Sequence, residues 1–353
     1  MTRQDRFLTA LHNQQPDRVP LFDFLFQQPL YEELIGHRPG GYNGPDAVQC
    51  ALALDHDAVW LPFGGFSNYQ PTFLSEDVYV DEWGTTYQHS PSSWPIDAPI
   101  AYPITSRADL AKYELPDPTR EGRDAEIRAA AALDHDGLAL VGGVQGPLTT
   151  AWLLMGYENI ALAMYDDPGL VEAVLKLSNE FFLEAARRSV AAGAVAVFVS
   201  EDLGSSTGGF FKLDHYRRYL LPPFAEIVAE IDSLGVPALL HACGRIYEYL
   251  PDLAETKLSA IHPLQRTAGM DLRRVKEEWG HRWCLIGNID SSRTLPYGTP
   301  EQVAAEVREA IDVAAPGGGY ILASDHSLHD GIPIANIREM FRVGAEYGRA
   351  AYQ

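Results

Sequence analysis

The stretch A-L-L-H-A-C-G-R-I, residues 238–246, indicates how the chain is organised. An apolar run leads into His241 and Cys243, and Gly244 follows at once. A short apolar run bounded by a glycine is typical of a buried strand in a parallel sheet. Positions i and i+2 of an extended strand lie on the same face, so His241 and Cys243 are expected to point the same way. The segment therefore predicts a core strand that ends in two potential metal ligands.

Similar apolar runs recur along the chain. Together they predict eight strands, at 19–24, 57–63, 138–144, 194–203, 236–243, 258–264, 282–290 and 319–326. Most are followed by helical periodicity, which is clearest at 168–193 and after Thr299, a potential N-cap followed by a proline. Eight strands alternating with helices favour one (β/α)8 (TIM) barrel of the α/β class over residues 1–353. A doubly wound sheet is the alternative, but residues 23–34 lack its glycine-rich first turn.

Residues 65–125 interrupt this alternation. They are predicted to form a long insertion after the second strand, with room for a hairpin. We expect the insertion near the barrel mouth, where it either covers the mouth or decorates the surface.

Composition restricts the classes of function. The net charge is −21 and no cluster of Lys and Arg is present, so a nucleic-acid partner is not expected. No apolar run approaches the ~20 residues of a membrane span, and the polar N-terminal stretch is unlike a signal peptide. Three cysteines provide no disulfide framework, which is typical of a reducing compartment. These features predict a cytoplasmic protein, with Cys50 and Cys284 in its core.

Polar side chains gather where the predicted strands end. In a (β/α)8 barrel the carboxyl ends of the strands form the active site. The candidates there are Asp23, Gln145, Glu201, Asp202, His241, Cys243, His262, Asn288, Asp290, Asp325 and His326. A packed barrel core does not need these groups, so we interpret them as candidates for chemistry.

A zinc site is one chemistry that these residues can support. Imidazole nitrogen and thiolate sulfur are ligands that zinc prefers, and His241 and Cys243 supply one of each. Glu201, on the neighbouring strand, is the expected third ligand, and Asp325 or His326 can add a fourth. The structural alternative is that Cys243 is a small core residue and that His241 bonds to a backbone carbonyl. Three aromatic residues, Phe24, Phe63 and Trp152, either line a pocket or pack in the core.

Several motifs carry a family resemblance across nearly the whole chain. They are RFLTALHNQQPDRVP (6–20), GPLTTAWLLMGYENI (146–160), LLHACGRI (239–246), LIGNIDSSRTLPYGTPEQV (285–303), and PGGGYILASDH (316–326) followed by IPIANI (332–337). In this order they resemble the uroporphyrinogen decarboxylase superfamily. The resemblance implies a (β/α)8 barrel, usually dimeric. It also implies one of two chemistries: decarboxylation of a tetrapyrrole, or zinc-dependent methyl transfer from a methyl-corrinoid to a thiol or similar acceptor.

The chain departs from both branches of this superfamily. The decarboxylases carry an arginine-rich loop after the first strand and an Asp at the end of the second, but residues 19–37 contain no Arg or Lys and the second strand runs into WLPFGGF (60–66). A substrate with many carboxylates needs guanidinium partners. The methyltransferases carry His-x-Cys in the fifth strand, matched by His241 and Cys243, and a further Cys after the eighth. Here Asp325 and His326 stand at that place, and His326 matches a histidine of the decarboxylases.

The resemblance therefore favours a zinc-dependent methyltransferase that moves a methyl group between a corrinoid or small methylated donor and a thiol or similar acceptor. A corrinoid protein is the expected partner, beside a small-molecule substrate. The expected metal ligands are His241, Cys243 and Glu201; His326, Asp325, His262 and Asp290 are catalytic candidates; Asp23, Gln145, Asp202 and Asn288 are candidates for substrate binding. The alternatives are a decarboxylase or lyase for a smaller substrate, and a non-catalytic barrel that holds a corrinoid or tetrapyrrole.

Overall fold

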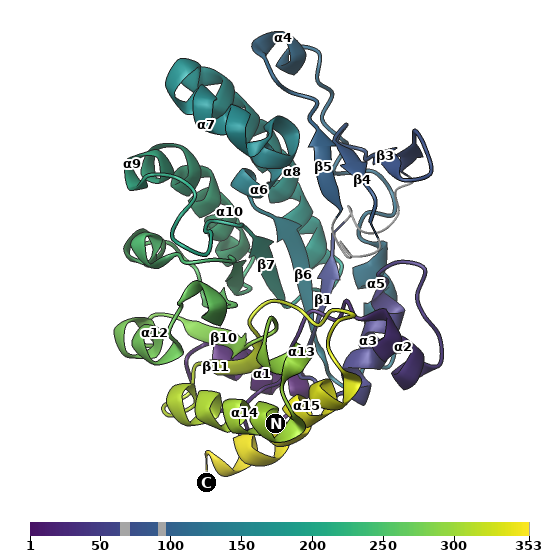
Figure 1. Ribbon diagram of the computed structural model, residues 1–353, viewed down its shortest axis with the longest axis vertical. Coiled ribbons are helices and arrows are strands. Elements are labelled where there is room, and N and C mark those ends of the chain that lie inside the picture. Colours follow the sequence, from purple (N-terminus) through teal and green to yellow (C-terminus); the bar gives the residue numbers. More distant parts are fainter. Residues whose placement is uncertain (64–70, 91–96, 353) are drawn as a thin grey trace.

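A computed structural model describes residues 1–63, 71–90 and 97–352. Its centre is a curled parallel sheet in which each strand pairs with the next along the chain, surrounded by helices (Figure 1). The strands are β1 (Ala58–Pro62), β6 (Ala139–Gln145), β7 (Ala196–Ser200), β8 (Ala238–His241), β9 (Ala260–His262), β10 (Cys284–Ile289) and β11 (Tyr320–Ser324). Their side chains are almost all buried, as expected for strands covered on both faces. The predicted barrel-type α/β fold is confirmed.

The predicted first strand, 19–24, is the exception, because it forms only isolated bridges. Leu21 bridges Leu322 and Leu25 bridges Leu328, both in parallel. Pro20 has no N–H to give to a ladder, and the Asp23 carboxylate accepts the Ser324 N–H at 2.7 Å. On the other side, the Asp57 N–H donates to the Leu21 carbonyl at 2.8 Å. Residues 19–26 thus occupy the eighth position, between β11 and β1, through irregular backbone and side-chain hydrogen bonds. We call this segment the seam.

The helices follow the sequence signals closely. The predicted helix at 168–193 is α8 (Pro168–Ala191), and the one after Thr299 is α14 (Pro300–Ala314), where Thr299 and Gln302 form a capping box. The others are α1 (Arg3–Leu11), α2 (Gln28–Ile35), α3 (Gly44–Ala53), α4 (Arg107–Leu110), α5 (Ala125–Ala131), α6 (Pro147–Met155), α7 (Tyr157–Asp166), α9 (Leu213–His215), α10 (Leu221–Ser233), α11 (Leu250–Leu253), α12 (Leu272–Trp279), α13 (Thr294–Tyr297) and α15 (Ile334–Ala350). Three short helical turns complete the set: η1 (Tyr216–Leu220), η2 (Tyr247–Tyr249) and η3 (Arg266–Ala268). Among the described helices, none is both long enough and apolar enough to cross a membrane.

The residues between β1 and α5 include a second, antiparallel sheet. Its strands are β2 (Thr72–Phe73), β3 (Val78–Val80), β4 (Thr86–Gln88) and β5 (Ala98–Ala101), in that order. Trp83 anchors it by stacking on Phe182 of α8, with ring centroids 5.7 Å apart, and the Thr85 hydroxyl donates to the Leu153 carbonyl of α6. The described part of the insertion therefore packs on helices α6 and α8 (Figure 1). Residues 64–70 and 91–96, which include the end of the WLPFGGF motif, lie outside the described residues.

The two cysteines predicted to be structural are buried. Cys50 lies in α3 and Cys284 begins β10, and neither side chain is exposed. Burial raises the pKa of the Cys50 thiol to about 12. Such a thiol stays protonated and unreactive at neutral pH, which agrees with a packing role.

Candidate metal centre

Several of the predicted site residues follow strands instead of lying within them. Strand β7 ends at Ser200 and β8 at His241, so Glu201, Asp202 and Cys243 begin the loops at the barrel mouth. Gly244 has φ +81°, and a Cβ there would collide with the backbone of Gly204. Glycine at this position lets the loops after β7 and β8 touch. This close approach places Cys243 next to the residues that follow β7.

Three potential metal ligands converge at this mouth. One ligand atom each from His241, Cys243 and His326 lies within 4.8 Å of the others. The Cys243 Sγ is 3.3 Å from the His241 Nε2, and the His241 and His326 rings stand nearly perpendicular with centroids 5.8 Å apart. His241 and Cys243 are half-buried and His326 is exposed. The predicted proximity of His241 and Cys243 is present, although Cys243 lies two residues beyond the strand.

A second histidine, His262, contacts His241. The Nδ1 atoms of His241 and His262 are 2.8 Å apart, and His262 is fully buried at the end of β9. Phe24, from the seam, packs edge-on against both rings, at centroid distances of 5.4 and 5.1 Å. Burial and the neighbouring histidines lower the pKa of His262 well below its usual value. His262 is therefore a neutral ring that fixes the orientation of His241.

Burial determines the protonation of the cluster. It lowers the pKa of His241 to about 4, against the opposing attraction of Asp202. It also lowers the pKa of His326, whose ring is surrounded by protein on one side although it reaches solvent. Burial raises the pKa of the Cys243 thiol, and the neighbouring Asp202 carboxylate adds to this effect. The two imidazoles are thus neutral and able to bind a cation through a nitrogen lone pair.

Asp202 faces the cluster from the β7 loop. One of its carboxylate oxygens is 4.0 Å from the His241 Nε2, and its backbone N–H donates to the Thr149 hydroxyl at 3.1 Å. The side chain is 39% exposed, so it lies at the border between the cluster and solvent. The Asp202 carboxylate therefore lies directly beside His241 of the cluster.

Glu201, the expected third ligand, lies outside this cluster. Its two carboxylate oxygens accept the Leu148 and Thr149 N–H groups of α6, at 2.9 and 3.0 Å. These free donors at the start of a helix attract a carboxylate, and Gly146 leaves it space because a Cβ there would collide with Glu201. Burial nevertheless raises the pKa of Glu201 to about 8. Both oxygens are already occupied, so the structure places Glu201 as a cap of α6.

Two further predicted residues brace the mouth. Asp23 accepts hydrogen bonds from the Ser324 N–H and hydroxyl, and burial raises its pKa to about 7. Asp325 is buried and accepts from the Ser291 N–H and hydroxyl at 2.8 and 2.7 Å, and from the Arg266 N–H at 3.0 Å. These carboxylates connect neighbouring strands and loops of the barrel.

The remaining candidates hold loops in a similar way. Asp290 accepts the Ser292 and Arg293 N–H groups, and Asn288 donates to the Leu264 carbonyl. The Gln145 amide oxygen accepts from the Thr150 hydroxyl at 3.4 Å.

Among the three aromatic candidates, Phe24 packs beneath the histidines and Phe63 packs on Phe181 of α8. Trp152 stacks on Tyr157, with ring centroids 4.7 Å apart. Tyr157 was not predicted. Burial raises its pKa, and its ring also packs on Phe210 of the loop after β7, with ring centroids 4.9 Å apart. Its motif reads as an ordinary helix start, so only the fold reveals this placement.

Comparison with known proteins identifies relatives with both chemistries. Residues 92–347 match the family model described as uroporphyrinogen decarboxylase (URO-D). A uroporphyrinogen decarboxylase of Alkalilimnicola ehrlichii is 26% identical, over 94% of this chain and 90% of that protein. The methylcobamide:CoM methyltransferase MtaA of Methanosarcina barkeri is also 26% identical, over 98% of both. A solved structure of a methyltransferase from Methanosarcina mazei superimposes with a TM-score of 0.74 at 21% identity, over 98% of this chain and 99% of that one.

The family match covers well over half of the chain, and both curated relatives span almost all of it. The solved structure supports the barrel fold independently. The chain is therefore a member of the uroporphyrinogen decarboxylase family.

Proposed function

We propose that this protein is a zinc-dependent methyltransferase. The observation that supports this most strongly is the cluster of His241, Cys243 and His326 at the mouth of the barrel. Catalytic zinc sites use three protein ligands and leave a fourth position for substrate. Two imidazoles and one thiol form such a set, and His326 takes the place of the second cysteine that the resemblance implies.

The donor set fits zinc in its spacing. Two ligand atoms of a tetrahedral zinc ion, at ~2.0 Å for nitrogen and ~2.3 Å for sulfur, lie about 3.5 Å apart. The Cys243 Sγ and His241 Nε2 are separated by 3.3 Å. The other nitrogen of His241 contacts His262, as metal-bound histidines commonly contact a partner that fixes the ring. When bound, zinc supplies a Lewis acid that lowers the pKa of a thiol acceptor.

The substrates we propose are a methyl-corrinoid, carried by a partner protein, and a thiol. In the transfer the thiol loses its proton, a sulfur–carbon bond forms, the cobalt–carbon bond breaks, and its electron pair stays on cobalt. The likeness to a methylcobamide methyltransferase along the whole chain supports this choice. We propose that the half-buried Asp202, whose buried Oδ1 lies 4.0 Å from the His241 Nε2, accepts the thiol proton. Dimer formation, which the resemblance implies, remains a prediction.

The site gives less support to decarboxylation of a tetrapyrrole with many carboxylates. Residues 19–37 contain no Arg or Lys, and the next cation, Arg38, is more than half exposed and pairs with Glu32. Within the seam, both carboxylate oxygens of Asp23 accept hydrogen bonds from Ser324. A decarboxylase would need cations at this part of the mouth to hold the substrate.

Two assays test the proposal. The purified chain should contain about one zinc ion, and it should convert methylcobalamin to cob(I)alamin when a thiol is added, followed by the visible spectrum. The matched variant is Cys243→Ala, with Cys284→Ala as a control in the core. Loss of zinc and turnover in the first variant alone is expected. Zinc-free protein, or coproporphyrinogen formation from uroporphyrinogen at the rate of an ordinary decarboxylase, would overturn it.

A further inference from the structure

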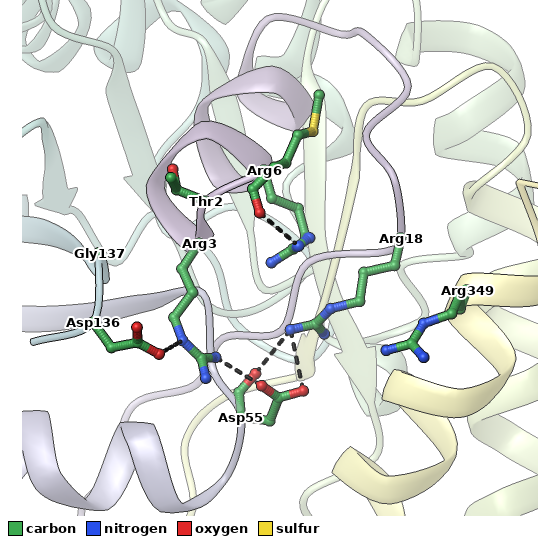
Figure 2. A pocket seen from close by; sticks show the side chains of 9 residues that line it. Thr2, Arg3, Arg6, Arg18, Asp55, Asp136, Gly137 and Arg349 are labelled. Atoms are coloured by element: carbon green, nitrogen blue, oxygen red, sulfur yellow. Dashed lines mark hydrogen bonds and ion pairs between the residues drawn. The ribbon is translucent and has the colours of Figure 1, made fainter.

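A cavity of about 480 Å³ lies at the opposite end of the barrel from the metal centre. Its wall includes Asp55, which precedes β1, and Asp136, which precedes β6, so it lies at the amino ends of the strands. Four arginines line it as well: Arg3 and Arg6 from α1, Arg18 from the loop before the seam, and Arg349 from α15 (Figure 2). Arginines from the first and last helices thus meet in one cavity, in a chain whose net charge is −21.

Three of these arginines already have carboxylate partners. Arg3 pairs with Asp55 at 2.7 Å, and Arg6 pairs with the fully buried Asp57 at 2.6 Å. Arg18 lies between the two aspartates, with its Nη2 3.2 Å from each. The aspartates near the cavity are thus paired with arginines, and these ion pairs hold the arginine side chains in fixed positions.

Two guanidinium groups keep unused donors. Arg18 is 5% exposed, and its buried Nη1 has no hydrogen-bond partner among the described residues. Burial lowers the pKa of Arg18 despite the attraction of Asp57 and Asp55, and the neighbouring Arg6 and Arg3 add to this effect. Arg349 is exposed and extends toward Arg18, and Figure 2 shows no hydrogen bond or ion pair from it to the other lining residues. The cavity wall therefore holds unused guanidinium donors on two neighbouring arginines.

We propose that the cavity binds a small oxyanion, a phosphate or carboxylate group, between Arg18 and Arg349. A planar guanidinium matches the oxygen spacing of both groups and can bind them with two parallel hydrogen bonds. The bound anion accepts a hydrogen bond from the Nη1 of Arg18 and joins α15 to the loop before the seam. The exposed carboxylates of Asp55 and Asp136 are left to accept hydrogen bonds from other groups of the same ligand.

Calorimetric titration of the full chain at constant ionic strength tests this site. The probes are inorganic phosphate, pyrophosphate and succinate, which separate a phosphate from a carboxylate preference. We expect saturable binding of at least one probe and a loss of about tenfold or more in affinity for Arg349→Gln. Arg342→Gln, two turns earlier on α15 and paired with Glu339 and Glu346, should bind like the wild type.

Two results of the titration would overturn the proposed anion site. One is the absence of saturable binding for all three probes, and the other is an equal affinity of the wild type and Arg349→Gln. Crystals of the wild-type chain soaked in tungstate give an answer without any variant, because anomalous density between Arg18 and Arg349 is expected. Tungstate bound elsewhere, with that position empty, also overturns it. Zinc content should be the same in Arg349→Gln as in the wild type, so the result is independent of the proposed methyl transfer.

Discussion

His241 and His262 face each other through their Nδ1 atoms at 2.8 Å, and one of the two must carry the proton between them. If His241 binds a metal through Nε2, its Nδ1 carries the proton and donates it to His262. The far nitrogen of His262, Nε2, is buried without a hydrogen-bond partner among the described residues. That arrangement fits a positioning residue whose one polar contact is to His241.

Replacing His262 therefore separates positioning from packing. His262→Phe keeps an aromatic ring next to Phe22, Phe24 and Phe198, so the melting temperature of the metal-free protein should change little. Zinc affinity should fall about 10- to 100-fold, because the orientation of His241 is no longer fixed. His262→Asn, which keeps an acceptor near the Nδ1 position, should recover most of it. Competition with a chelator measures the affinities, and equal values for His262→Phe and the wild type would exclude the positioning role.

The exposed member of the cluster, His326, gives the clearest test of the ligand set. His326→Gln should reduce zinc affinity by about tenfold or more and leave the metal-free melting temperature close to that of the wild type. His329→Gln is the matched control, since His329 follows the same strand but contacts the Ser291 carbonyl outside the cluster. Metal analysis and melting curves of the three proteins check this. If His326→Gln retains its zinc, another residue completes the site.

Glu201 should affect stability more than metal binding. Glu201→Gln presents an amide NH2 to two backbone donors of α6, so one N–H loses its acceptor. We expect the free energy of unfolding to fall by ~1–3 kcal/mol. Zinc content should remain near that of the wild type. Chemical denaturation of the metal-free protein together with metal analysis distinguishes the two roles, and loss of zinc without loss of stability would make Glu201 a ligand after all.

Acid sensitivity should originate partly at His56, far from the metal centre in the fold. His56 is fully buried against Phe341, and burial lowers its pKa to about 3, with Arg3 and Arg18 adding to the shift. Below pH 6.5 the unfolded chain binds a proton at this residue and the folded chain does not, so stability falls as the pH falls. Between pH 6.5 and 5 this amounts to ~2 kcal/mol. Denaturation at several pH values should show a correspondingly shallower decline for His56→Leu, and parallel curves would contradict the assignment.

The sequence predicted the barrel because its strands are short apolar runs, which can be recognised without knowing which elements pack together. It placed the ends of β7 and β8 too late, at residues 203 and 243 where the strands end at Ser200 and His241. The nearness of His241 and Cys243 was predicted correctly from their spacing, whereas the contact of the loops after β7 and β8 at Gly244 was not predicted. The spacing of residues in the sequence could not predict the contacts of His262 or Tyr157, because these contacts depend on how separate strands and helices are arranged.

Glu201 is another residue whose structural role could not be predicted from the sequence. A carboxylate after a strand can bind a metal or cap the helix that follows a neighbouring strand, and both possibilities look identical in the sequence. The structure shows hydrogen bonds from Leu148 and Thr149. Asp23 and Asp325 repeat this pattern with Ser324 and Ser291. A polar residue at a strand end can therefore serve to hold loops and strands together.

The seam has a consequence for how the chain reaches its final shape during synthesis. Asp23 is bonded to Ser324, 301 residues later, so its partner leaves the ribosome only when nearly the whole protein has been made. Until then, Leu21, Phe22 and Leu25 have no β11 to cover them and remain an apolar surface on a nascent chain. Contacts so distant in sequence form slowly, and such surfaces are prone to association. The seam and β11 can therefore pair only after Tyr320–Ser324 has been synthesised, so this junction of the barrel closes near the end of synthesis at the earliest.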